Sequence, residues 1–310
     1  MTLVYISPWS DADVWRREVA KHLPGEELRS WPDVGDVREI DAALVWKPPH
    51  GALATLPNLK LIASLGAGVE QLLADPALPK GVPITRLVHP AMTEQMSEYV
   101  VLGVVAGLRK MVDYMALQRE RRWVEIARDV APPSARTVGV LGLGELGSDA
   151  ARKLKALGYQ VAGWSRSARS LAGIRCHHGA EGLGAFLGAC DAIACLLPLT
   201  PATRGIIARA TIDRMRPGVV IVNAARGGHV VDDDLLAALD DGRVGLAVLD
   251  VFNDEPLPAD HRYWSHPRVV MTPHVAALTM PMMADVIIDN VKRLRAGQPF
   301  RHLVDVTRGY

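Results

Sequence analysis

The chain has 310 residues, 49% of them hydrophobic and 22% charged, so it is long enough for two domains with separate cores. Its formal net charge of +1 gives no strong field toward nucleic acid or an anionic membrane, and we expect neither as a partner. The three cysteines, Cys176, Cys190 and Cys195, are odd in number and lack CxxC spacing, which argues against a disulfide framework or a metal site. The sequence shows no leader-like start and no apolar run long enough to span a bilayer, which predicts a cytoplasmic protein.

Short aliphatic runs alternate with longer helical patterns along the chain, which is typical of a parallel sheet covered by helices. The first part predicts strands at 3–7, 42–46, 59–65 and 83–87, and then one long helix or two over 93–123. A second series of strand-like runs begins at 137–141 and ends at 268–274, and residues 282–294 have helical spacing. The pattern predicts an α/β protein with two doubly wound parallel-sheet units.

The stretch VGVLGLGELGSDAARKLKALGYQVAGWSRS, residues 138–167, has the pattern of a strand, a glycine-rich turn, a helix and a second strand. Gly142 permits the tight turn, Gly144 lets the backbone approach a pyrophosphate, and Gly147 lets the helix lie close to the sheet. The pattern predicts a dinucleotide site, and a plain strand-to-helix turn with packing glycines is the alternative. Amide donors at the helix start would face the phosphates, those of Glu145 and Leu146 included.

The second strand of this unit ends on Ser165, Arg166 and Ser167, where such sites usually hold an acidic side chain. A carboxylate would accept hydrogen bonds from both ribose hydroxyls but would repel a 2′-phosphate. A hydroxyl and a guanidinium instead offer that phosphate donors and positive charge, to which Arg169 would add. The turn therefore predicts NADPH rather than NADH as the cofactor, and a solvated turn that tolerates these residues is the alternative.

Three later stretches resemble the signatures of the D-isomer-specific 2-hydroxyacid dehydrogenases: VNAARGGHVVDDDLLAAL at 222–239, GLAVLDVFNDEPLP at 245–258 and MTPHVAALT at 271–279. The resemblance extends over essentially the whole chain. The stretches ALVWKPP, SLGAGVEQLL, GWSRS and VTRGY are most similar to the NADPH-dependent glyoxylate/hydroxypyruvate reductase A branch. The resemblance implies a Rossmann NADP-binding domain at 104–280, inserted into a smaller flavodoxin-like substrate domain of residues 1–103 and 281–310, and a homodimer.

The resemblance implies three catalytic residues. Arg226 would bind the substrate carboxylate and carbonyl oxygen, which suits a guanidinium because it stays charged and forms a planar fork. His274 would be the general acid/base that protonates the ketone oxygen. Glu255 would be its carboxylate partner, fixing the ring and favouring the imidazolium. Taken singly, each of the three is also compatible with a structural or surface role.

Further contacts to cofactor and substrate are implied by the same resemblance. Cofactor contacts would come from Leu197, Pro198, Thr203, Ala225, Asp250, Arg226 and His274, with Asp250 at the nicotinamide carboxamide. Asp250 interrupts an apolar run, and hydrogen bonds within the protein would satisfy it equally well.

On the substrate side, the resemblance implies backbone contacts at Ala67, Gly68 and Val69, and Trp46 as a wall of the pocket. Lys47 would attract an anionic substrate. The alternatives are a helix-start turn without a ligand at 67–69 and a core role for Trp46. The histidines without a comparable setting are predicted to be structural or surface residues: His89, His177, His178, His229, His261 and His266.

The predicted reaction is hydride transfer from NADPH to glyoxylate or hydroxypyruvate, giving glycolate or glycerate. Closure of the two domains over a cleft would exclude water. Two alternatives stay open at this point. The chain could act on another D-2-hydroxy acid, larger or phosphorylated, or it could be a non-catalytic dinucleotide-sensing protein, since a fold does not by itself give a function.

Overall fold

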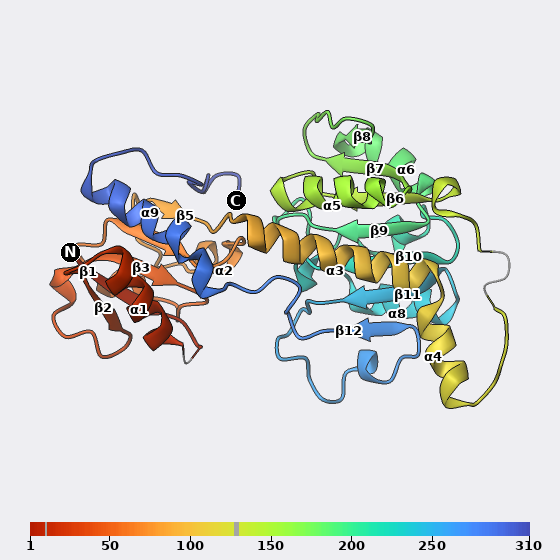
Figure 1. Ribbon diagram of the computed structural model, residues 1–310, viewed down its shortest axis with the longest axis horizontal. Coiled ribbons are helices and arrows are strands. Elements are labelled where there is room, and N and C mark those ends of the chain that lie inside the picture. Colours follow the sequence, from red (N-terminus) through yellow and green to blue (C-terminus); the bar gives the residue numbers. More distant parts are fainter. Residues whose placement is uncertain (10, 127–129) are drawn as a thin grey trace. The chain divides into compact units, whose positions relative to one another are not determined.

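Two parallel β-sheets form the framework of the computed structural model, which describes residues 1–9, 11–126 and 130–310 (Figure 1). One sheet belongs to a unit made of Met1–Met92 and Leu278–Tyr310, and the other to a unit made of Thr93–Ala277. All strand pairs within the two sheets are parallel in the described residues. The predicted fold class, α/β with two doubly wound parallel sheets, is confirmed.

The sheet of the first unit has the strand order β2-β1-β3-β4-β5, which is the flavodoxin-like order. The strands β1 and β3 lie at its centre and are almost wholly buried, as expected of aliphatic runs covered on both faces. Helix α9, from the C-terminal segment, contacts β4 and α1. The elements are β1 (Thr2–Ile6), α1 (Ala12–His22), β2 (Glu27–Ser30), β3 (Ile40–Val45), β4 (Leu61–Ser64), α2 (Glu70–Leu73), β5 (Ile84–Thr85) and α9 (Ala284–Arg295).

The sheet of the second unit has the order β12-β11-β10-β9-β6-β7-β8, the Rossmann order with one strand added at the β12 edge. The strands are β6 (Thr137–Leu141), β7 (Gln160–Ser165), β8 (Arg175–His178), β9 (Ala192–Cys195), β10 (Val219–Asn223), β11 (Val244–Leu249) and β12 (Val269–Met271). The helices are α3 (Pro90–Leu108), α4 (Met111–Arg119), α5 (Glu145–Ala156), α6 (Gly179–Ala189), α7 (Arg209–Ile212) and α8 (Asp232–Asp240).

The segment 93–123 forms two helices, α3 and α4, which part at the left-handed Lys110 (φ 59°). Helix α3 lies unusually close to β10, because a Cβ built on Gly107 would approach Val220 Cγ1 to 2.6 Å. The predicted domain boundary at 103/104 falls inside this helix, whereas the compact units divide at 92/93 and 277/278. Continuous contact of α3 with the Rossmann sheet explains the earlier division.

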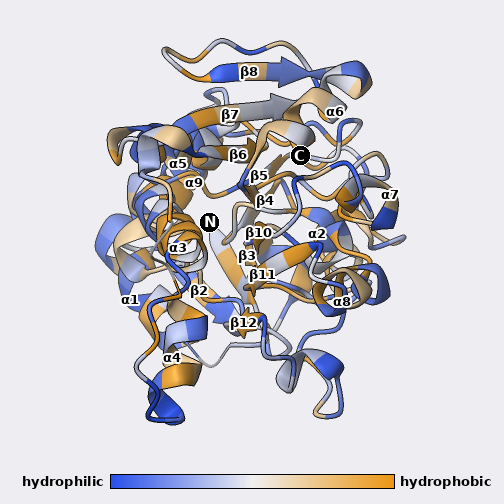
Figure 2. Cartoon of the chain, turned by 90° about the vertical axis from the view of Figure 1, so that its right-hand side faces the viewer, coloured by the Kyte–Doolittle hydropathy of each residue, from blue (hydrophilic) through white to orange (hydrophobic). Residues whose placement is uncertain are grey.

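The edge strands β2 and β8 are the ones that aliphatic periodicity did not predict. Their sequences are ELRS and RCHH, and β8 is largely hydrophilic in Figure 2. An edge strand needs few buried side chains, so it lacks the aliphatic run that marks a central strand. Hydrophobic pattern therefore predicts the middle of each sheet better than its edges.

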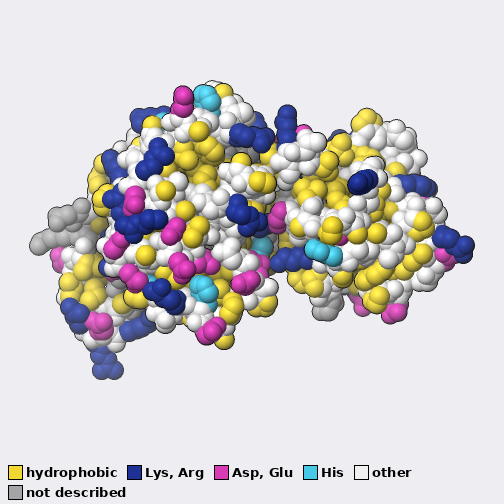
Figure 3. Space-filling model, turned by 180° about the vertical axis from the view of Figure 1, so that it is seen from behind, with side chains coloured by type: hydrophobic (Ala, Val, Ile, Leu, Met, Phe, Trp, Pro, Cys, Tyr) yellow, Lys and Arg dark blue, Asp and Glu magenta, His cyan; other side chains and the backbone are white. Residues whose placement is uncertain are grey.

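Two of the three cysteines, Cys190 and Cys195, are buried. All three cysteines are free, and burial raises the pKa of the Cys190 and Cys195 thiols to about 12, which keeps them protonated. In the described ranges, no helix combines the length and apolarity needed to cross a membrane, and no cluster of His, Cys, Asp or Glu suits a metal ion. Basic and acidic side chains are interspersed on the face shown in Figure 3.

Candidate active site

The three predicted catalytic residues follow three neighbouring strands of the Rossmann sheet. Arg226 lies three residues after the end of β10, Glu255 lies in the loop after β11, and His274 lies just after β12. Carboxyl ends of parallel strands open on the same edge of a sheet, where ligands bind in α/β folds. The fold therefore gathers these residues at one edge of the second unit.

His274 and Glu255 form a direct pair. The Nδ1 of His274 lies 2.8 Å from Oε2 of Glu255, and both side chains are about three-quarters covered, with 26% and 21% exposed. The other carboxylate oxygen of Glu255 accepts from the backbone N–H of Phe252 at 3.1 Å. A carboxylate only accepts, so Nδ1 donates, and the remaining ring nitrogen of His274 is Nε2.

His274 has a left-handed backbone (φ 57°), a conformation rare for a residue other than glycine. Asp250 is buried, at 1% exposure, and accepts a hydrogen bond from this segment at each of three oxygen atoms. Its backbone oxygen accepts from the N–H of His274 at 2.8 Å, and its two carboxylate oxygens accept from the N–H groups of Val275 at 2.8 Å and Ala276 at 2.9 Å. Asp250 thus fixes the backbone of His274, the predicted catalytic histidine.

A chain of hydroxyls completes the support of Asp250. Thr272 Oγ1 donates to Asp250 Oδ1 at 2.6 Å, and Tyr99 on α3 in turn contacts Thr272 Oγ1 through its own hydroxyl at 2.6 Å. Because the threonine proton points to Asp250, the tyrosine is the donor in the second bond. Protein groups satisfy both carboxylate oxygens of Asp250, in line with the structural alternative considered for it. Its predicted contact with the nicotinamide carboxamide stays a prediction.

Arg226 lies between β10 and a short 3₁₀ helix, Gly227–His229, and is partly buried. Its guanidinium Nη1 donates to the carbonyl oxygen of Ala225 at 2.6 Å. The buried Asn223 anchors this turn, because its Nδ2 donates to Arg226 O at 2.9 Å and its Oδ1 accepts from Ala225 N at 3.2 Å. Hydrogen bonds from the Asn223 side chain therefore hold the backbone of the turn that carries Arg226.

Gly227 brings the arginine turn against the loop that carries Glu255. A Cβ at this position would lie 1.9 Å from the carbonyl carbon of Phe252. Any side chain larger than hydrogen would separate the two loops. Close packing at Gly227 thus joins the Arg226 turn to the loop that carries Glu255.

The glycine-rich turn has the form that a pyrophosphate requires. Gly142 has φ +101°, and a Cβ on Gly147 would lie 1.7 Å from Gly142 O, so both positions demand glycine. At Gly144 a Cβ would meet no atom within 4 Å, so the turn faces open space there. The helix α5 begins at Glu145, and the N–H groups of its first turn lack partners within the helix, as at any helix start, so they suit an anion. The residues present fit a dinucleotide.

The turn after β7 is only partly exposed. Ser165 is the last residue of the strand and is buried, and its Oγ donates to the carbonyl oxygen of Ser167 at 2.8 Å. Arg166 and Ser167 are exposed. The hydroxyl of Ser165 therefore closes the turn, and Arg166 is the residue through which the turn presents charge. The predicted contacts of 165–167 with a 2′-phosphate stay predictions.

The remaining predicted cofactor residues lie beside the same edge. Leu197, Thr203 and Ala225 are buried, and Thr203 Oγ1 donates to Pro198 O at 2.7 Å and accepts from Thr200 N at 2.9 Å. The threonine thus closes the loop 198–203 onto itself. Its hydroxyl serves the shape of the loop, and a direct contact with the cofactor is still a prediction.

In the first unit, Trp46 packs as a core residue would. It is 9% exposed, stacks on Trp9 at 5.6 Å between ring centroids, and covers Gly66 so closely that a Cβ there would lie 2.0 Å from its ring. Lys47 places its Nζ 6.0 Å from the centroid of the Trp46 ring. Ala67 and Gly68 are partly buried in the turn before α2. A substrate role for Trp46, Ala67, Gly68 and Val69 stays a prediction.

Sequence reasoning missed the residues that support Arg226 and His274. Asn223 and His229 contact the backbone oxygen of Arg226. Thr272 donates to the carboxylate of Asp250, and Tyr99 bonds to the hydroxyl of Thr272. A polar residue at the end of an apolar strand was the available signal for Asn223, since a buried amide requires partners. Tyr99 gave no local signal, because its partner is 173 positions away in the chain.

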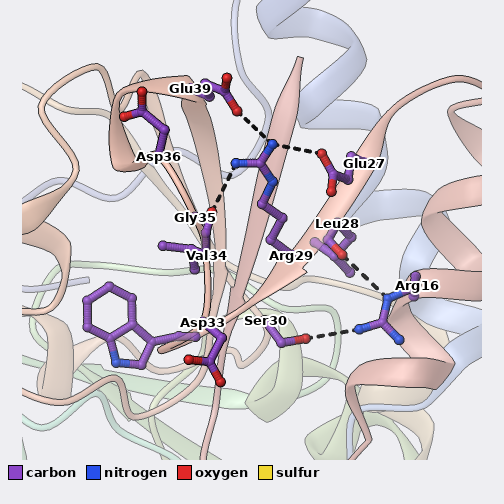
Figure 4. Close-up of a pocket in the computed structure, with 11 residues that line it drawn as sticks. Arg16, Glu27, Leu28, Arg29, Ser30, Asp33, Val34, Gly35, Asp36 and Glu39 are labelled. Atoms are coloured by element: carbon purple, nitrogen blue, oxygen red, sulfur yellow. Dashed lines mark hydrogen bonds and ion pairs between the residues drawn. The ribbon is translucent and has the colours of Figure 1, made fainter.

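A charged groove along β2 in the first unit holds none of the predicted site residues (Figure 4). Its central arginine, Arg29, donates to Glu27 at 2.9 Å, Glu39 at 2.6 Å and Val34 O at 2.9 Å. Arg16 donates to Ser30 at 3.2 Å. The two arginines are engaged with groups of the groove itself, and we assign this groove no role.

Comparison with known proteins identifies the family of this chain. The family model for the NAD binding domain of the D-isomer specific 2-hydroxyacid dehydrogenases matches residues 101–276. The chain belongs to the D-isomer-specific 2-hydroxyacid dehydrogenase family. Among curated members, glyoxylate/hydroxypyruvate reductase A of Serratia proteamaculans is 41% identical over 316 aligned residues, covering 100% of both chains. The resemblance inferred from the motifs is confirmed.

Solved structures of the family share the fold over the full length. A 2-hydroxyacid dehydrogenase from Xanthobacter autotrophicus Py2, in complex with NADPH and MES, has a TM-score of 0.94 at 39% identity, covering 100% of this chain and 99% of that one. The NADPH-dependent glyoxylate/hydroxypyruvate reductase of Sinorhizobium meliloti, in complex with NADP and sulfate, has a TM-score of 0.93 at 38% identity and the same coverage. This chain is thus similar over its entire length to enzymes solved with the phosphorylated cofactor.

Proposed function

We propose that this 2-hydroxyacid dehydrogenase reduces glyoxylate and hydroxypyruvate with NADPH, yielding glycolate and glycerate. The observation that carries the proposal is the hydrogen-bonded His274–Glu255 pair, which follows strands adjacent to the one that presents Arg226. Full-length similarity to reductases named for these two substrates supports the choice of substrate. The turn at 142–147, which fits a dinucleotide, supports the choice of reaction.

The proposed catalytic side chains have two tasks. Arg226 would supply positive charge, and His274 with Glu255 would supply a proton. Bound NADPH would supply the hydride. Arg226 would hold the substrate carboxylate with its planar guanidinium and draw charge from the carbonyl oxygen. Glu255 holds Nδ1–H of His274, so the proton that reaches the carbonyl oxygen would come from Nε2.

The cofactor would be held by backbone at one end and by charge at the other. The open face at Gly144 and the start of α5 would receive the pyrophosphate, and the exposed Arg166 would pair with the 2′-phosphate. The buried Asp250 would contribute through His274, whose backbone it fixes. These residue roles are proposals that rest on position and on the family resemblance.

The chain also presents a surface suited to a second copy. Leu102 on α3, Met111 and Met115 on α4 and Trp123 beyond it are exposed apolar side chains, and Trp123 is 96% exposed. Solvent exposure of so large an aromatic is costly in a monomer and typical of an interface. We infer a homodimer through this surface, which light scattering on the purified protein would test.

The experiment that tests the proposed function is a panel of 2-oxo acids with the purified protein. NADPH oxidation is followed at a fixed protein concentration with glyoxylate, hydroxypyruvate, a branched 2-oxo acid and a phosphorylated one. The proposal predicts the highest catalytic efficiency with the two small acids. A preference for the larger or phosphorylated acid would assign the chain to a different member of the family.

A further inference from the structure

His229 occupies a position that the catalytic roles do not explain. It is fully buried, at 0% exposure, within the 3₁₀ turn that follows Arg226. Its ring lies between two backbone carbonyl oxygens: Nδ1 is 3.1 Å from Arg226 O and Nε2 is 3.4 Å from Pro198 O. His229, which the sequence predicts to be a structural or surface residue, therefore lies between two segments that carry predicted site residues.

The chemistry of this bridge depends on which nitrogen bears the proton. A carbonyl oxygen only accepts, so each ring nitrogen must donate to make its contact. Neutral imidazole has a single N–H, hence one tautomer bonds to Arg226 and the other to Pro198. The imidazolium would serve both. The backbone of His229 is itself fixed, since its N–H donates to Arg226 O at 3.2 Å and its oxygen accepts from Ile207 N at 2.8 Å.

One carbonyl group belongs to the turn that would bind the substrate, and the other belongs to the loop that would bind the cofactor. Arg226 O sits at the root of the substrate-binding arginine and also accepts from Asn223 Nδ2 at 2.9 Å. Pro198 O belongs to the loop 198–203, where Thr203 Oγ1 donates to the same oxygen at 2.7 Å. A displacement of the ring would therefore disturb the arginine turn and the cofactor loop together.

We propose that His229 is a positioning residue that ties the Arg226 turn to the Pro198–Thr203 loop, so that the substrate arginine and the cofactor loop are set in register. The inference rests on the proposed function, because that proposal assigns Arg226 to the substrate and Pro198 to the cofactor. His229 touches neither. It acts through the two backbone carbonyls that it joins.

Two amide substitutions separate the two halves of the bridge. The side-chain amide of Asn reaches the place of Nδ1–H, whereas that of Gln reaches the place of Nε2–H. His229→Asn therefore places a donor at Arg226 O alone, and His229→Gln places one at Pro198 O alone. Loss of one such bond is worth about 0.5–1.5 kcal/mol, or roughly two- to tenfold in a binding or kinetic constant.

The readouts are NADPH affinity by fluorescence titration and kcat/KM for glyoxylate at saturating NADPH. His229→Asn is expected to weaken NADPH by roughly two- to tenfold and to retain kcat/KM for glyoxylate within about twofold. His229→Gln is expected to retain NADPH affinity and to lower kcat/KM for glyoxylate by a similar factor. Equal effects of both variants on both readouts, with equal Tm, would reduce His229 to a packing residue and overturn the proposal.

A second variant covers the case in which neither His229 substitution folds. Thr203→Val removes the other donor to Pro198 O and leaves the histidine in place. The proposal predicts that this change weakens NADPH and leaves kcat/KM for glyoxylate within about twofold, because Nδ1 of His229 still contacts Arg226 O. An equal loss in both readouts would contradict the assignment of Pro198 O to the cofactor side.

Failure of the proposed function would be visible separately. A wild-type protein that binds NADPH but reduces neither acid would refute the proposed reaction. The fluorescence titration needs no turnover, so it would still test the bridge. Equal NADPH affinities of the Asn and Gln variants would then overturn the contact with Pro198.

Discussion

At the scale of single residues, the account depends most on Arg226. Replacement with lysine keeps the positive charge and removes the fork, so Arg226→Lys should fold, bind NADPH and lose kcat/KM for glyoxylate. A charge-assisted bond is worth about 1.5–3 kcal/mol, which corresponds to a loss of roughly ten- to a hundredfold. Steady-state kinetics on the purified variant provide the measurement.

The matched control is Arg204→Lys, which makes the same chemical change at an exposed arginine in the loop before Gly205. Arg204 lies outside the predicted site and should retain near-wild-type efficiency. Equal kinetics for the Arg226 and Arg204 variants would remove Arg226 from the substrate site.

The pairing of His274 with Glu255 can be tested by changing either partner. Glu255→Gln replaces the charged acceptor of Nδ1–H with a neutral amide, which accepts this hydrogen bond more weakly, so kcat should fall. His274→Ala should lose most turnover. The measurement is kcat for glyoxylate reduction by the two variants, and a wild-type rate in the Glu255 variant would refute the pairing.

Thr272 tests whether the backbone of His274 needs its support. Thr272→Ser keeps the hydroxyl that bonds to Asp250 and Tyr99, while Thr272→Val keeps the shape and removes it. The valine variant should lose roughly two- to tenfold in kcat, by the worth of one or two such bonds, and the serine variant should rescue it. Similar kcat values for the two variants would show that the hydroxyl chain is dispensable.

Tyr99 keeps its donor role over the whole working range of pH. Burial raises its pKa to about 12, opposed by the bond with Thr272 and aided by the charge of Asp250. The folded value lies above the ordinary 10.0, so the stability contributed by this protonated hydroxyl is fully present below pH 10 and lost as the pH rises through about 12. The difference between the Thr272 variants should therefore not change between neutral and mildly alkaline pH.

At the scale of elements, we expect the turn after β7 to determine the choice between NADPH and NADH. Arg166 is exposed there, whereas Ser165 is buried and bonded within the turn, so the arginine should carry the preference for the 2′-phosphate. Arg166→Ala should weaken NADPH roughly ten- to a hundredfold and change NADH little. The ratio of catalytic efficiencies with the two cofactors, at fixed ionic strength, is the measurement.

The control for this prediction is Arg38→Ala in the first unit, which removes one exposed positive charge far along the chain from the turn. It should leave the cofactor ratio unchanged. Equal weakening of NADPH and NADH in the Arg166 variant would mean that the arginine does not face the 2′-phosphate.

The sequence predicted the buried central strands better than the exposed edge strands. Aliphatic runs predicted the central strands, and the glycines at 142, 144 and 147 predicted the turn before α5. At Gly142 the positive φ, and at Gly147 the close contact with Gly142 O, leave room for little but glycine. Polar edge strands such as RCHH and the break at Lys110 gave no periodic signal.

In the candidate site, the sequence predicted the residues that lie in motifs but not the residues that support them. Motifs indicated Arg226, Glu255 and His274, and the direct bond of the last two is present in the structure. Their supports were not predictable, since Tyr99 and Thr272, or Pro198 and His229, meet only through the fold. The hydroxyl of Ser165 also turned inward, which no local pattern reveals.

At the scale of the whole molecule, the second unit brings together a glycine-rich turn, the guanidinium of Arg226 and the bonded pair of His274 and Glu255 along one edge of one sheet. A protein that only sensed a dinucleotide would need the turn but not the paired His274 and Glu255. The combination is what distinguishes a reductase from a binding protein on the same fold.

The most direct test is therefore stoichiometric product formation by the wild-type protein. Purified protein is incubated with NADPH and excess glyoxylate, and NADPH consumed and glycolate formed are measured in the same samples. The account predicts one glycolate for each NADPH oxidised, with His274→Ala inactive under the same conditions. NADPH that binds tightly but is not consumed, or is consumed without glycolate appearing, would contradict the assignment as a glyoxylate reductase.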